Sequence, residues 1–209
     1  MFQVQNIQWL PLIVEFLQEL SLIFSLFVLC LAKTGLILFY RNSGVALGNC
    51  AIFVKTIILE KLLEITLQNR KILYKYLTET PREQLLRIPE GFNNSIWWNI
   101  AHVVVTQQLL VYQLSKQQMR VEDGLVDKFK KGTKPDGTAT EEEIKKIANY
   151  LISTVEWTKE DLENGLFKEY NEYTTSANVT LTNVSAAMAF NVFHEGIHLG
   201  AILALKKVV

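Results

Sequence analysis

The sequence predicts an all-α protein built on a four-helix bundle, and three observations support this class. The 209 residues include only four prolines and ten glycines, so long stretches contain no residue that breaks a helix. Hydrophobic residues make up 49% of the chain, enough for a sizeable core. Four long segments repeat apolar residues at the spacing of an amphipathic helix. The 21 basic and 21 acidic residues balance, so nothing suggests the basic surface that nucleic-acid binding needs.

Residues 1–53 differ in composition from the rest, and we expect them to form a hydrophobic N-terminal extension ahead of a helical domain at 54–209. They contain only four charged side chains. The segment Leu20–Tyr40 is long enough to span a bilayer, but Lys33 near its middle costs about 3 kcal/mol on insertion scales. The only charged residues before this segment are two glutamates, whereas a signal peptide needs positively charged residues there.

Two interpretations of this extension stay open. It is either a real membrane or packing segment, or an over-extended reading frame of a protein whose translation starts at Val54. The expected location is the cytoplasm, and a membrane anchor at residues 20–40 is the alternative.

The first two helices of the domain are expected at residues 56–77 and 95–118. The first is followed by Pro81, as is common just beyond a helix end. The second starts after Ser95, a residue type preferred at the N-cap. A short helix is expected between them at Arg82–Leu86.

The last two helices are expected at residues 140–164 and 182–207. Thr140 and Glu143 have the spacing of a capping box, and Gly165 is suited to end the same helix. The final helix has Thr182 or Asn183 as its N-cap.

The connections between these helices are polar. Residues 125–139 are expected to form a lysine-rich loop with a turn at Pro135–Gly137. Residues 166–181 are expected to form a short hairpin or a cover over one end of the bundle.

The three histidines are the strongest chemical signal in the domain. Two of them lie in the stretch FHEGIHLG, where His194 and His198 are four residues apart and so share one face of a helix. That face continues through Val184, Asn191 and other core-type residues, while Glu195 is expected beside it. His102 shares its face of the second long helix with Trp98 and Val105, so it also points inward.

A lone inward histidine is usually a hydrogen-bonded core residue, but three of them are costly to bury without partners. A shared metal ion would satisfy all three at once, so we expect His102, His194 and His198 to bind one divalent ion.

The stretch from His194 to His198 also fits the H-E-x-x-H pattern of zinc proteases. In such enzymes a further ligand follows the helix, but only LGAILALKKVV follows His198, and it contains no histidine, carboxylate or cysteine. The third ligand must therefore lie upstream, which argues against the protease interpretation.

The order of these motifs resembles the DinB/YfiT-like superfamily. The matching pieces are SIWWNIAHVVVTQQLLVY around His102 and HEGIHLGAIL at the C-terminal end. The resemblance covers roughly residues 54–209 and leaves residues 1–53 without a counterpart. It implies a four-helix bundle with a long crossover connection and a divalent metal, zinc or nickel, held by His102, His194 and His198.

The resemblance also implies a class of chemistry. Characterised relatives include transferases and isomerases that use low-molecular-weight thiols. Apart from the resemblance, we expect that the protein could form a homodimer. Family members often have arginine after the last histidine, but this chain has Leu199, which puts any role of that arginine in doubt.

Three histidines leave a coordination position open, which is typical of a catalytic metal site. The domain contains no cysteine, since Cys30 and Cys50 both precede it, so a thiol would have to come from a small-molecule cosubstrate. We therefore expect a metal-dependent transferase or hydrolase, or alternatively a non-catalytic, metal-stabilised bundle with a binding or stress-response role.

Four polar residues near the histidines are candidates for supporting this chemistry. Glu195 and Asn191 are the catalytic candidates. Together with Asn99 and Thr106 they are also candidates for hydrogen bonds to the metal ligands or for proton transfer.

Overall fold

A computed structural model describes residues 44–209, with side chains from Phe53 onward. The apolar segment expected at residues 20–40 therefore lies outside the described residues. The chain divides into two compact units, Met1–Lys55 and Thr56–Val209. The account below concerns the second unit.

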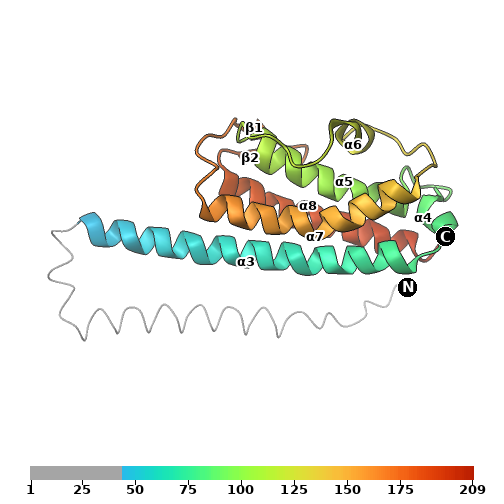
Figure 1. Cartoon of the computed structure of the whole chain (residues 1–209), viewed down its shortest axis with the longest axis horizontal. Helices are drawn as coiled ribbons and strands as arrows, with labels where there is room; N and C mark the ends of the chain where they lie inside the picture. The colour runs from blue at the N-terminus through green and yellow to red at the C-terminus, as the bar shows by residue number, and fades with distance from the viewer. Residues whose placement is uncertain (1–43) are drawn as a thin grey trace, which may run out of the picture. The chain divides into compact units, whose positions relative to one another are not determined.

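The described part of the chain is mostly helical, which confirms the all-α class. It contains four long helices: α3 (Gly44–Glu79), α5 (Ile96–Gln108), α7 (Glu141–Glu163) and α8 (Val184–Leu205). Within the second unit, the part of α3 from Thr56 onward lies alongside α5, α7 and α8 (Figure 1). The shorter elements are α4 (Arg82–Leu86), the π-helix η2 (Leu109–Gln113), α6 (Asp123–Phe129) and the strands β1 (Tyr173–Thr174) and β2 (Thr180–Leu181).

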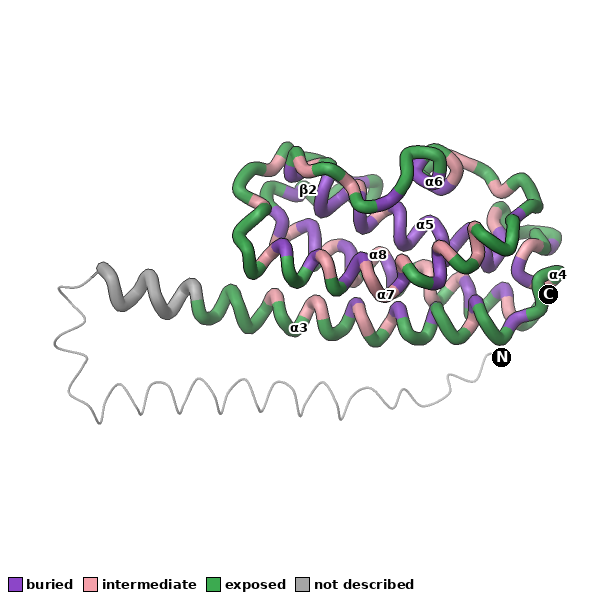
Figure 2. Tube along the Cα trace, viewed as in Figure 1, coloured by how far each residue is buried: buried purple, intermediate pink, exposed green. Residues whose placement is uncertain are grey.

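Helix α5 lies at the centre of the unit, where it contacts α4, α6, α7 and α8. Nearly all of its residues are buried, and the segment is mostly purple in Figure 2. The sequence predicted one regular helix to residue 118, but the α-helix ends at Gln108 and continues as the π-turn η2. Such turns occur frequently at functional sites, and here the turn adjoins the end of α5.

Three of the four predicted starts of the long helices are confirmed by their hydrogen bonds, whereas the helix expected from residue 56 begins earlier, at Gly44. The Ser95 side chain accepts from the Trp98 amide, and Thr140 and Glu143 form a complete capping box on α7. On α8 the N-cap is Asn183, whose side chain accepts from the Ala186 amide at 2.9 Å. These bonds satisfy amide groups that have no partner within the helix.

The prediction that residues 125–139 form only a loop is wrong, because α6 occupies its first part. Leu125, Val126 and Phe129 are buried, and the Phe129 ring meets Trp97 edge-on at 5.4 Å between centroids. This helix is short, and the lysines around it made the segment resemble a polar loop in the sequence. The predicted turn does occur, and Gly137 adopts a φ of +74° there.

The hairpin expected within residues 166–181 is confirmed. Strands β1 and β2 pair antiparallel, with Tyr173 opposite Leu181 and Thr174 opposite Thr180. The hairpin contacts α8 through β2.

By length and composition, one helix in the described part of the chain, Val184–Leu205, could cross a membrane. This helix α8 also packs on α5 and η2 and contains a buried ion-pair partner, Glu195. The core helix of a soluble protein passes the same test, and 28% of the apolar window of α8 is buried.

Candidate metal centre

Helices α5 and α8 bring the three histidines together. His102 from α5 and His194 and His198 from α8 each offer a ring nitrogen, and these atoms all lie within 4.8 Å of one another. The ring centroids are separated by 4.5 to 5.2 Å. His102 is buried, and the other two are half-buried.

A backbone carbonyl determines which nitrogen of His102 is free to act as a ligand. The Nδ1 of His102 lies 2.6 Å from the Phe129 carbonyl oxygen, which can only accept, so Nδ1 carries the proton. The lone pair is then on Nε2, 3.2 Å from the Thr106 hydroxyl. Trp98 stacks on the same ring at 4.5 Å and fixes its plane. The carbonyl that orients the first histidine thus comes from the last residue of α6.

The side-chain amide of Asn99 determines which nitrogen of His198 is free to act as a ligand. The Asn99 Nδ2 donates to the Ser95 carbonyl oxygen at 2.8 Å, which fixes the orientation of the amide. Its Oδ1 therefore accepts from the Nδ1 of His198 at 2.7 Å. The lone pair of His198 is left on Nε2, as in His102. Histidine ligands of metal ions are commonly oriented by partners of this kind.

The separation of the ligand nitrogens fits a metal ion. The Nε2 atoms of His194 and His198 are 3.2 Å apart. Two nitrogens bound tetrahedrally at about 2.0–2.1 Å from one zinc ion would be about 3.3 Å apart. The other nitrogen of His194, Nδ1, is buried without a partner among the described residues. The three-nitrogen donor set suits zinc, nickel and related ions.

The surroundings keep these imidazoles neutral, as metal ligation requires. Burial is the first cause in each case and lowers the pKa of His102, His194 and His198, the latter two to about 4 and about 3. The neighbouring imidazoles contribute to the lowered pKa values of His194 and His198. Near neutral pH all three therefore present an uncharged nitrogen.

The histidines line a cavity of about 450 Å³, a volume that could accommodate a small organic molecule. Most of its lining surface is apolar, and the apolar residues lie on η2, directly after η2 and on α8. The apolar residues are Leu109, Leu110, Leu114, Phe190 and Ile197.

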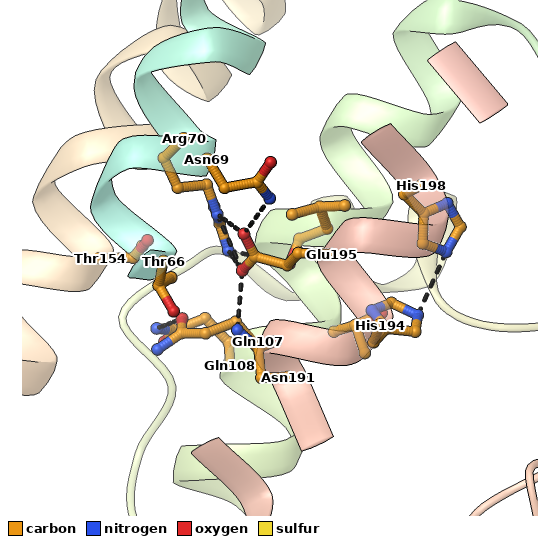
Figure 3. Close-up of polar contacts among 12 residues, drawn as sticks. Thr66, Asn69, Arg70, Gln107, Gln108, Thr154, Asn191, His194, Glu195 and His198 are labelled. Atoms are coloured by element: carbon orange, nitrogen blue, oxygen red, sulfur yellow. Dashed lines mark hydrogen bonds and ion pairs between the residues drawn. The ribbon is translucent and has the colours of Figure 1, made fainter. Parts of the chain in front are cut away.

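Glu195 and Asn191, the predicted catalytic residues, lie in a different place from the histidines. The Glu195 carboxylate accepts from the Arg70 guanidinium at 2.9 and 3.0 Å, from Asn69 at 2.9 Å and from Asn191 at 2.7 Å. Figure 3 shows this cluster on the side of α8 that faces α3, while His194 and His198 extend toward the opposite side. Neither Glu195 nor Asn191 lines the cavity. Their catalytic role stays a prediction, and their contacts indicate a structural role.

Arg70 links the two helices that carry the histidines. It is fully buried, and Glu195 is only 1% exposed, so Glu195 lies beside the histidine stripe as predicted, but on a second buried side of α8 that faces α3. Besides Glu195 on α8, the guanidinium binds the Val103 carbonyl oxygen of α5 at 3.1 Å. Each of its partners is adjacent in sequence to a histidine, either His194 or His102.

The sequence did contain a signal for Arg70, which our prediction missed. Thr66, Arg70, Leu73 and Leu77 are all buried and recur at helical spacing along α3. Ile65, the apolar residue directly before Thr66, is 45% exposed and lies off this stripe. A charged residue on the true inward stripe would have indicated a buried ion pair.

Comparison with known families supports the resemblance seen in the sequence. A profile of the DinB superfamily matches residues 65–202, a range that includes all three histidines. A search of curated proteins finds no match.

Proposed function

The chain belongs to the DinB superfamily, whose profile matches most of its length, and on this premise we propose that it is a metal-dependent enzyme acting on a small molecule. The reaction class we propose is group transfer or hydrolysis. The metal is a divalent ion, zinc or nickel, held by His102, His194 and His198.

One observation carries this proposal: the three histidines that could hold an ion also line a cavity of about 450 Å³. A structural zinc site normally has four protein ligands, whereas a catalytic site keeps a position open. The described residues offer only these three histidines at the site, and the cavity gives a substrate access to them.

The protein's own residues hold the ligands and shape the site. Phe129 and Asn99 keep the Nδ1 protons of His102 and His198 in place, so both Nε2 atoms stay available. The apolar cavity walls limit water around the reacting groups. A bound zinc or nickel ion would supply a Lewis acid that activates water or a thiol near neutral pH.

The proposal also covers the helix arrangement, the cosubstrate, the location and the assembly. The helices form a four-helix bundle with a long crossover connection. Because the sequence after Cys50 contains no cysteine, a low-molecular-weight thiol is the natural cosubstrate for a transferase. We expect a cytoplasmic protein, with a homodimer as a reasonable assembly and no nucleic-acid partner.

A test of this proposal starts with the metal. Purified full-length protein should contain about one divalent ion per chain by elemental analysis, and His102→Ala, His194→Ala and His198→Ala should each reduce that content sharply. The loaded protein should then be screened for transfer of small thiols to electrophiles and for hydrolysis of small esters and amides. Normal metal content in His102→Ala would contradict the three-histidine site.

The non-catalytic alternative remains testable in the same experiment. A metal-stabilised bundle would bind the ion and melt at a higher temperature with it, but would show no turnover in any screen. The cavity beside the histidines favours the enzyme.

A further inference from the structure

A single lysine on the loop after α6 faces the same cavity as the histidines. Lys131 is one of the cavity-lining residues and is exposed to solvent. The other polar lining residues apart from the histidines are neutral: Thr106, Gln113, Tyr173, Thr175 and Ser176. No aspartate or glutamate lines the cavity.

The position of Lys131 is fixed by contacts to the metal centre on both sides. Two residues before it, the Phe129 carbonyl accepts from His102, and two residues after it, the Thr133 hydroxyl accepts from the Trp98 indole at 3.1 Å. The same hydroxyl donates to the Lys130 carbonyl oxygen at 2.8 Å and closes the turn. The backbone of Lys131 is thus held near His102 rather than on a free loop.

Lys131 also differs from its neighbours in charge pairing. Lys128 binds Asp136 and Glu143, and Lys130 binds Asp127. Among the described residues, Lys131 has no carboxylate within ion-pair distance. Its charge is therefore available to a ligand in the cavity.

We propose that the cavity selects small organic anions with an apolar body, and that Lys131 is the residue that recognises the anionic group. The apolar body packs on Leu109, Leu114, Phe190 and Ile197, which line the same cavity. This inference rests on the proposed function, since it uses the same cavity, and it adds the charge of the substrate. An unpaired cation on an otherwise neutral wall attracts anions and disfavours cations.

The test compares two probes of equal size, hexanoate and its neutral analogue hexanamide, by NMR titration of the full-length protein at low salt. The titration is done on zinc-free and on zinc-loaded protein. We expect hexanoate to bind more tightly than hexanamide in both forms. Lys131→Gln should weaken hexanoate binding about two- to fivefold, the size expected for one solvent-exposed ion pair, and leave hexanamide binding unchanged. Lys131→Glu should reverse the preference.

The matched control is Lys134→Gln, since Lys134 is an exposed lysine of the same loop that does not line the cavity. It should leave both affinities as in the wild type. The proposal is overturned if neither probe binds, or if Lys131→Gln leaves hexanoate affinity unchanged in the zinc-free protein. Hexanoate binding that needs zinc and ignores Lys131 also overturns it, because the metal would then be the anion receptor. A protein that binds no zinc would instead refute the proposed function, and the zinc-free titration would still report on Lys131.

Discussion

Metal binding at the candidate site depends on which nitrogen of each histidine carries the proton. Two of the three rings have this choice made for them, His102 by the Phe129 carbonyl and His198 by the Asn99 amide. A ring held in the correct tautomer and orientation loses less entropy when it binds an ion. The supporting residues therefore matter almost as much as the ligands.

Asn99 gives the sharpest test of this point. Asn99→Ala removes the acceptor for the Nδ1 proton of His198, so zinc affinity should fall by about 10- to 100-fold. The affinity is measured by competition with a chromophoric chelator. Asn99→Asp is the matched control, because a carboxylate still accepts that proton, and it should retain most of the affinity. Equal losses in both variants would show that Asn99 acts on the fold rather than on His198.

Glu195 is expected to act on stability and not on metal binding. Glu195→Gln weakens the buried pair with Arg70, and breaking such a pair typically costs about 3–5 kcal/mol. Chemical denaturation should show a large loss in the free energy of unfolding, while zinc per folded chain stays near the wild-type value. Glu156→Gln, at an exposed position on α7, should change neither quantity. Loss of zinc without loss of stability would instead restore a direct role for Glu195 at the metal.

At this scale the sequence predicted the cluster of three histidines and two of their hydrogen-bond partners, Asn99 and Thr106, but not the Phe129 carbonyl. His194 and His198 share a helix face, and four-residue spacing is enough to bring them together. The Phe129 carbonyl belongs to the backbone, so its role leaves no mark on residue type. The Arg70–Glu195 pair joins residues far apart in the chain, and no local pattern connects them. Asn99 could be named in advance because it lies on the same helix as His102.

The sequence predicts the start of a helix correctly where a capping residue marks it. The N-caps at Ser95 and Thr140 agree with the sequence prediction. The misses occur at the start of α3, at the short helix α6, and at η2, where the change from α to π geometry has no residue signature. The two elements that were not predicted, α6 and η2, contribute to the site. Helix α6 provides the Phe129 carbonyl, and η2 provides Leu109 and Leu110 to the cavity.

The capping box of α7 allows an element-scale prediction. Thr140→Ala removes the hydroxyl that accepts from the Glu143 amide, so the free energy of unfolding should fall by about 1 kcal/mol. Thr140→Ser keeps the hydroxyl, so its free energy of unfolding should fall by less. Because α7 contributes no histidine, zinc affinity should be the same in both variants and in the wild type. A change in zinc affinity would mean that the end of α7 is coupled to the metal centre.

At the scale of the whole molecule, the metal and the fold are expected to stabilise each other. An ion that binds only the folded protein adds to the free energy of unfolding. Addition of a chelator near pH 7 should therefore lower the melting temperature of the zinc-loaded protein. The size of the decrease measures how much the packed helices depend on the ion.

Acidification should destabilise the protein even without metal, and the direction follows from the histidine pKa values. A histidine in the unfolded chain titrates near ~6.5, whereas burial lowers the pKa of His194 to about 4 and that of His198 to about 3 in the folded protein. As the pH falls, the unfolded chain binds protons first. The contribution of the neutral histidines is thus full above about pH 6.5 and is lost as the pH falls toward their folded pKa values. The melting temperature of metal-free protein should decrease from about pH 7 to about pH 4.

Zinc should make this dependence steeper, because protons and the ion compete for the same nitrogens. The loaded protein should release zinc over the same range and take up more than one proton per ion, which a pH-indicator assay can count. The variant His194→Gln/His198→Gln should flatten the pH profile of the metal-free protein. A wild-type profile that stays level would mean that these histidines are already hydrated in the folded state.

If the chelator removes all zinc but leaves the melting temperature unchanged, packing alone holds the three histidines in place. Such a preformed site would favour the enzyme over the metal-stabilised bundle, because the ion would then contribute chemistry and not stability.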